Sequence, residues 1–185
     1  MAGNDTSFGP LPRLTFVLGG ARSGKSSFAQ TLAEQAAETA GHKLFYIATA
    51  EIRDAEMADR VAAHQRARGP EWHAREAPRD LGAALRAVDA PGHVLLVDCL
   101  TLWLSNVMEA ESGSGLAARF DALLADLAAL SGRAILVSNE VGLGIVPDNA
   151  LARAFRDQAG RLNQQVAAQA DQVFFVAAGL PLKMK

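Results

Sequence analysis

The stretch that decides the fold is Leu14–Ser26, which reads LTFVLGGARSGKS. Its first five residues form a short apolar run, which predicts a buried β-strand. The next eight residues, Gly19–Ser26, match the pattern G-x-x-x-x-G-K-[ST] at every fixed position. Glycines in this motif let backbone N–H groups curl around a phosphate, and the start of the following helix adds partial positive charge. The stretch therefore predicts a strand, a phosphate-binding loop and a helix.

Each position of this loop has an expected role. Lys25 is expected to reach the β- and γ-phosphates, and the Ser26 hydroxyl is expected to ligate Mg²⁺. A chance glycine-rich turn is the alternative, but it would need neither the strand before it nor the helix after it. The residues expected to contact nucleotide here are Gly19, Gly20, Ala21, Arg22, Ser23, Gly24, Lys25 and Ser26.

The rest of the chain alternates between apolar runs and helical spacing. The expected strands are 14–18, 44–48, 94–97, 134–138 and 173–176, with a short extended piece at 72–76. The expected helices are 26–39, 54–68, 80–88, 100–108, 116–130 and 151–170. Strands that are apolar throughout and alternate with helices predict an α/β fold with a mainly parallel central sheet and helices on both faces. Ligands of such sheets bind beyond the carboxyl ends of the strands.

Size and composition narrow the class of protein further. A chain of 185 residues is expected to form a single domain, here 14–185, preceded by a flexible extension at 1–13 that contains Gly and Pro. The net charge of −2 excludes a global basic surface for nucleic acid. One cysteine excludes an internal disulfide and favours a reducing compartment, here the cytoplasm. No apolar run approaches the roughly 20 residues of a membrane span.

Asp98 directly follows the apolar run 94–97. An acid at the end of a buried strand matches the position that holds Mg²⁺ in phosphate-loop enzymes. The alternative is that Asp98 caps the next helix, since a strand followed by an acid is a common pattern. The phosphate loop favours the metal role.

Two further features remain open on chemistry alone. His64 lies on the expected helix 54–68, where an apolar face meets basic side chains, and by itself this setting fits a structural histidine better than a nucleophile. The segment 138–144 (SNEVGLG) follows a strand and suits a ligand loop, but also an ordinary Gly-rich connection.

Four segments together resemble a known family. They are GGARSGKSSFAQ, YIATAEIRDAEMADRVAAHQRARG, LLVDCLTLWLSN and SNEVGLGIVPDNALARAFRDQAGRLNQQVAAQAD. They look like the bifunctional adenosylcobinamide kinase / adenosylcobinamide-phosphate guanylyltransferase of cobalamin biosynthesis. The resemblance runs from about residue 14 to the end of the chain. It implies a RecA-like P-loop NTPase fold and a homotrimer.

The resemblance also implies two reactions and their residues. ATP or GTP phosphorylates adenosylcobinamide, and GMP then passes from GTP through a histidine, here His64, to the cobinamide phosphate. Further nucleotide contacts that the resemblance implies are Ala48, Thr49, Ala50, Gln65, Arg66, Ala67, Arg68, Glu76 and Asp98. A small-molecule kinase without guanylyl transfer and a nucleotide-dependent switch are the alternatives. The histidine segment and the 139–149 block argue against both.

Overall fold

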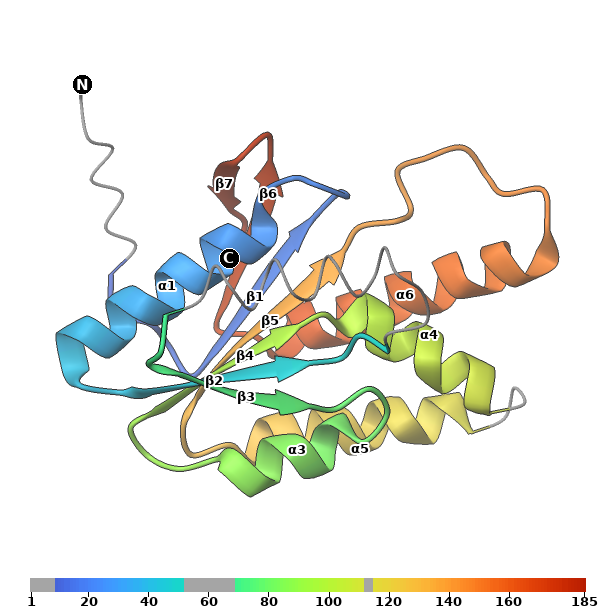
Figure 1. The fold of residues 1–185 in the computed structure, drawn as a ribbon. Helices are drawn as coiled ribbons and strands as arrows, with labels where there is room; N and C mark the ends of the chain where they lie inside the picture. The colour runs from blue at the N-terminus through green and yellow to red at the C-terminus, as the bar shows by residue number, and fades with distance from the viewer. Residues whose placement is uncertain (1–8, 52–68, 112–114) are drawn as a thin grey trace.

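A computed structural model describes residues 9–51, 69–111 and 115–185. Its centre is one seven-stranded sheet with the strand order β3-β2-β4-β5-β1-β6-β7 (Figure 1). The strands are β1 (Leu14–Gly19), β2 (Lys43–Ala48), β3 (Trp72–Glu76), β4 (His93–Asp98), β5 (Arg133–Asn139), β6 (Gln172–Ala177) and β7 (Leu180–Lys183). Every pairing is parallel except that of β6 with β7. The expected mainly parallel α/β sheet is confirmed.

Helices cover both faces of the sheet, as expected. They are α1 (Lys25–Ala40), α3 (Leu81–Val88), α4 (Leu100–Ala110), α5 (Leu116–Ala129) and α6 (Ala150–Gln169). Helix α1 packs on one face, where Ala29, Leu32 and Ala33 join a core layer with strand residues such as Val137. The other four helices pack on the opposite face (Figure 1). Because successive side chains of a strand point to opposite faces, the apolar runs supply both layers.

Strand β7 is an element that the sequence did not predict. It pairs antiparallel with β6 through a two-residue turn at Ala178 and Gly179, which have φ of 51° and 78°. Two consecutive positive φ values match the tight turn that suits the twist of a hairpin. The Gly179 N–H donates to the Ser23 carbonyl at 2.8 Å, so this turn also supports the phosphate loop.

The residues before β1 pack partly on the body of the protein. Leu11 is buried, and its carbonyl accepts a hydrogen bond from Arg133 Nε at 2.7 Å. Arg13 Nη1 donates to the Leu127 carbonyl at 2.9 Å. The expected helix 54–68 and residues 1–8 of the expected extension lie outside the described residues. No described helix is long and apolar enough to cross a membrane.

Candidate active site

The phosphate loop lies between the end of β1 and the start of α1, as the motif requires. Its chain curls back on itself: Ser23 N–H donates to the Gly20 carbonyl at 3.3 Å. Lys25 Nζ donates to the same carbonyl at 3.2 Å. Lys25 is 8% exposed, so its ammonium is held over the loop and not extended into solvent. A cation held here is positioned to neutralise phosphate charge.

Two glycines of the loop are required by its geometry. Gly24 has φ of 93°, a left-handed conformation that side chains with a Cβ rarely adopt. A Cβ on Gly19 would lie 2.4 Å from the Val176 carbonyl oxygen and 2.5 Å from Ser23 Oγ. The backbone can therefore form this cradle only with glycine at both positions.

Asp98 ends β4 on the face of the sheet that α1 covers. Tyr46 donates its hydroxyl hydrogen to Asp98 Oδ2 at 3.2 Å. The N-cap of α4 is Cys99, and no side chain caps that helix. The capping role considered for Asp98 is therefore absent. Its carboxylate and the Ser26 hydroxyl supply hard oxygen atoms of the kind that Mg²⁺ prefers, so these residues fit the metal.

Thr49 fastens the chain that follows Asp98. Thr49 is fully buried, and its Oγ1 donates to the Cys99 carbonyl at 2.7 Å and accepts from the Cys99 N–H at 2.8 Å. Asn106 Nδ2 donates to the Thr49 carbonyl at 2.8 Å. The Thr49 hydroxyl is thus used within the protein. The nucleotide contact expected at 48–50 stays a prediction.

Cys99 is chemically quiet despite its place beside the site. Burial and the neighbouring Asp98 carboxylate raise the pKa of its thiol to about 11, although Lys25 acts in the opposite direction. The thiolate is the reactive form of cysteine, so Cys99 is no candidate nucleophile at neutral pH.

Glu76 and Ala48 extend the same row across the sheet. In the strand register, Ala48 pairs with both Glu76 and Asp98. Residues paired in this way share a face, so the sheet places Glu76 two strands from Asp98. Three of the expected nucleotide contacts therefore lie along one carboxyl edge with the phosphate loop.

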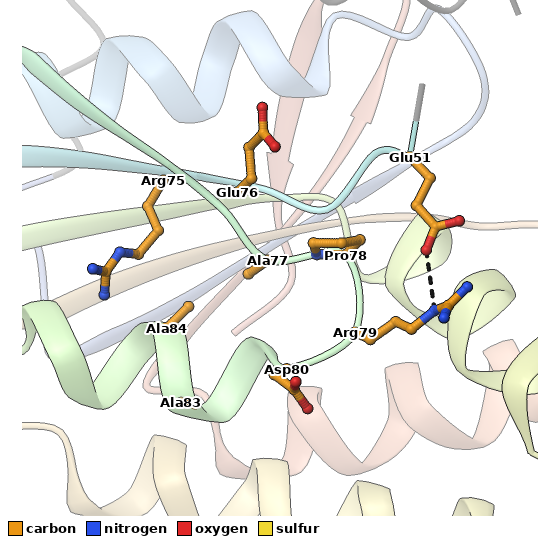
Figure 2. A pocket seen from close by; sticks show the side chains of 9 residues that line it. All are labelled: Glu51, Arg75, Glu76, Ala77, Pro78, Arg79, Asp80, Ala83 and Ala84. Carbon is orange, nitrogen blue, oxygen red and sulfur yellow. Dashed lines mark ion pairs between the residues drawn. The ribbon is translucent and has the colours of Figure 1, made fainter. Parts of the chain in front are cut away.

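A pocket of about 580 Å³ opens where β3 ends and α3 begins. Figure 2 shows Glu76 and Arg75 pointing to opposite sides of β3, and Arg79 paired with Glu51. The distance from Arg79 Nε to Glu51 Oε1 is 3.0 Å. The lining residues are Glu51, Arg75, Glu76, Ala77, Pro78, Arg79, Asp80, Ala83 and Ala84. Apart from Glu76, none was singled out in the sequence, because isolated Arg and Glu residues carry no motif.

The loop at 138–144 also reaches this edge. Asn139 pairs with Gly19 in the β1–β5 register, and the Glu140 N–H donates to the Gly19 carbonyl at 3.1 Å. Two supporting residues that the sequence did not reveal are Thr101, on α4, and Asn163, on α6. Asn163 follows a leucine on an ordinary amphipathic helix, so no local signal marks it.

His64, Gln65, Arg66, Ala67 and Arg68 lie outside the described residues. Their assigned roles stay predictions. The described part of the site holds the phosphate loop, Lys25, Ser26, Asp98 and Glu76, and it is complete enough to define a class. A phosphate loop and a strand-end acid on one edge of a parallel sheet define a P-loop nucleotide-binding enzyme.

Comparison with known proteins gives the family. The sequence model of "Cobinamide kinase / cobinamide phosphate guanyltransferase" matches residues 15–184, and the chain belongs to this family. The "Bifunctional adenosylcobalamin biosynthesis protein CobP" of Pseudomonas aeruginosa is 47% identical over 169 residues, covering 91% of this chain and 95% of the relative. CobU proteins of Salmonella typhimurium and Escherichia coli are 38% and 36% identical, and each alignment covers 93% of this chain and 99% of the relative. The resemblance identified from the sequence is confirmed.

Solved structures with a similar fold include an ATPase domain and the flagellar accessory protein FlaH of Methanocaldococcus jannaschii. Their TM-scores are both 0.49, at 12% and 13% identity. They cover 88% and 90% of this chain, which spans 68% and 71% of theirs.

Proposed function

We propose that this chain catalyses two consecutive reactions of cobalamin biosynthesis, as the names of its family and relatives indicate. It phosphorylates adenosylcobinamide and then transfers GMP to the product, releasing pyrophosphate and giving adenosylcobinamide-GDP. The observation that carries the proposal is the family match over residues 15–184, joined to a phosphate loop and Asp98 on one edge of the sheet. We further propose that 14–185 acts as a single catalytic domain.

For the kinase step, the chain has to hold a triphosphate and neutralise its charge. The backbone of Gly19–Gly24 surrounds the phosphates, and Lys25 stabilises charge on the transferring γ-phosphoryl group. Ser26 and Asp98 hold Mg²⁺, which when bound bridges phosphate oxygens and offsets their charge. The acceptor is the hydroxyl of the aminopropanol arm. ATP and GTP are the proposed donors.

For the guanylyl transfer, we propose His64 as nucleophile. An imidazole near its reference pKa of about 6.5 is largely neutral at pH 7. Its nitrogen attacks the α-phosphorus of GTP, pyrophosphate leaves, and a phosphoramidate holds GMP until the cobinamide phosphate accepts it. Gln65–Arg68 and Glu76 are the proposed nucleotide contacts. A carboxylate such as that of Glu76 can accept hydrogen bonds only, which suits the amino and N–H donors of guanine.

The proposed assembly is a homotrimer in the cytoplasm. The family resemblance supports the trimer, and a single cysteine, buried as a neutral thiol, supports a reducing compartment. Light scattering at working concentration tests the assembly. A particle with the mass of one chain would reject it.

The deciding experiment is incubation with GTP labelled at the α-phosphate, followed by denaturation and mass spectrometry. We expect one GMP on His64, released in mild acid and retained in alkali, because phosphoramidates are acid-labile. His64→Ala should abolish the label and keep kinase turnover. A kinase alone would form no covalent GMP, and a switch would bind GTP without consuming adenosylcobinamide. A GMP on another residue would refute the role of His64.

A further inference from the structure

Asn139 occupies a special place at the carboxyl edge of the sheet. Strand β5 lies between β4, which carries Asp98, and β1, which leads into the phosphate loop. Asn139 pairs with Gly19 in the register of β5 with β1. Asp98 pairs with Val137, two residues earlier on β5. Asn139 is therefore flanked by the first residue of the phosphate loop and by the strand of the acid.

Asn139 also lies on the face of the sheet that the phosphate-loop helix covers. Ile135 and Val137 belong to the core layer shared with α1. Side chains alternate along a strand, so the next residue on that face is Asn139. By the same alternation, Asp98 follows Val94 and Leu96 on this face.

The backbone of Asn139 is fixed on both sides. Its N–H donates to Thr101 Oγ1 at 2.7 Å, and its carbonyl accepts from Asn163 Nδ2 at 3.2 Å. Thr101 and Asn163 are 8% and 5% exposed. The next residue, Glu140, donates its N–H to the Gly19 carbonyl. Three different elements thus hold one peptide unit against the phosphate loop.

The side chain of Asn139, in contrast, has an amide oxygen without a partner. Its Oδ1 is buried and accepts no hydrogen bond within the residues that the structure describes. A buried polar group without a partner costs about 1–3 kcal/mol, so such groups in enzymes often mark the place of a ligand. A half-turn of the amide exchanges its oxygen and its NH₂ group, so the same place can present a donor. The side chain as a whole is only partly buried, which leaves it open to a bound molecule.

We propose that Asn139 is a further catalytic residue of the kinase site, whose side-chain amide donates a hydrogen bond to the γ-phosphoryl group of the bound triphosphate. The proposal rests on the proposed kinase function of the phosphate loop. Thr101 and Asn163 are positioning residues, since they act through the Asn139 backbone. The α- and β-phosphates are served by the loop itself, so the Asn139 contact distinguishes a triphosphate from a diphosphate.

The transfer leaves Asn139 chemically unchanged. The acceptor hydroxyl oxygen bonds to the γ-phosphorus, and the bond from that phosphorus to the β,γ-bridging oxygen breaks. The electron pair of the broken bond stays on the bridging oxygen of the diphosphate, and the hydroxyl proton passes to solvent. Negative charge on the γ-phosphoryl oxygens is shared with the N–H donor throughout, which lowers the barrier.

The test compares the binding of ADP with that of a non-hydrolysable β,γ-imido analogue of ATP by calorimetry. Asn139→Ala should raise the Kd of the triphosphate analogue about tenfold, the effect of one hydrogen bond to a charged group, with the Kd of ADP nearly unchanged. Asn139→Asp keeps the size of the side chain but places a carboxylate against phosphate. It should weaken the analogue further, again without loss of ADP.

Asn149→Ala is the matched control, because Asn149 is exposed and its Oδ1 accepts from Ala152 N–H at the start of α6. This variant should keep the wild-type ratio of the two Kd values. Equal losses of ADP and the analogue in both Asn139 variants would show a structural role and overturn the proposal, as would unchanged binding of both. The ratio needs no turnover. A wild-type protein that fails to phosphorylate adenosylcobinamide while the ratio shifts would refute the proposed substrate and support the contact.

Discussion

Replacing Thr49 with valine removes a hydroxyl that fastens the residue after Asp98. Valine keeps the shape of the side chain but can neither donate nor accept a hydrogen bond. The Cys99 N–H then loses its 2.8 Å acceptor inside the protein. The Cys99 carbonyl loses its 2.7 Å donor but keeps the Trp103 N–H at 3.2 Å. The two losses are therefore unequal.

Their sizes follow from burial. A buried N–H left without a partner costs about 1–3 kcal/mol, and the second bond adds about 1 kcal/mol. We expect Thr49→Val to lower the free energy of unfolding by about 2–4 kcal/mol. With a typical urea dependence of about 2 kcal/mol per molar, the midpoint falls by about 1–2 M. A domain with roughly 5–15 kcal/mol of stability remains folded, so its activity can be measured.

The control is Thr49→Ser, which keeps the hydroxyl and loses one methyl group, worth about 1 kcal/mol. Urea unfolding followed by far-UV circular dichroism gives the midpoints, and Mg²⁺ titration of kinase activity reports on Asp98. We expect Thr49→Val to need more Mg²⁺ than Thr49→Ser, because the peptide next to Asp98 is released. Equal midpoints for the two variants would refute the reasoning.

The remaining predictions concern charge. Lys25→Ala should lower kinase kcat by about 10²–10³-fold, as loss of one transition-state donor does, and near-normal turnover at saturating nucleotide would refute its role. Asp98→Asn should shift the Mg²⁺ activation curve to higher concentration with the urea midpoint little changed; an unmoved curve would end the metal assignment. Burial opposes ionisation of Asp89, but hydrogen bonds from Ser131 and Gly132 outweigh it and hold the pKa of its carboxyl below the ordinary value. Because the folded pKa is lowered, the stabilisation is present above about pH 4 and is lost as pH falls through the folded value, so Asp89→Asn should flatten the acid side of a stability–pH curve. Lys185 Nζ donates to the Ala168 and Ala170 carbonyls at 3.1 and 2.6 Å at the end of α6, and Lys185→Ala should cost about 1–2 kcal/mol in urea unfolding, whereas no change would show these bonds to be without net effect.

The parts of the fold that could be predicted are those whose cause is local. Gly19–Ser26 specifies its own backbone, since glycines and a lysine at fixed spacing need only the strand before them and the helix after them. The buried strand of Asp98 was readable for the same reason, because four apolar residues precede the acid. The family resemblance then assigned Glu76 and Ala48, which no local pattern marks.

What could not be predicted depends on residues far apart in the chain. Strand β7 contains Pro181 and is only four residues long, so it exists because β6 offers an edge for pairing. Asn163 serves the site through the Asn139 carbonyl, 24 residues earlier in the chain. The Thr49 hydroxyl meets Cys99 across 50 residues. Such pairs become visible only when the strands are placed side by side.

The two outer strands of the sheet carry a consequence for how copies of the chain can meet. At one side, β3 reads WHARE and exposes His73, Arg75 and Glu76. At the other, β7 reads LPLK, and Pro181 has no N–H to donate. Charges and proline on outer strands discourage backbone pairing with a neighbouring molecule. Copies of this chain are therefore expected to join through helices and loops and not by running one continuous sheet from molecule to molecule, which also protects the concentrated protein from edge-to-edge aggregation.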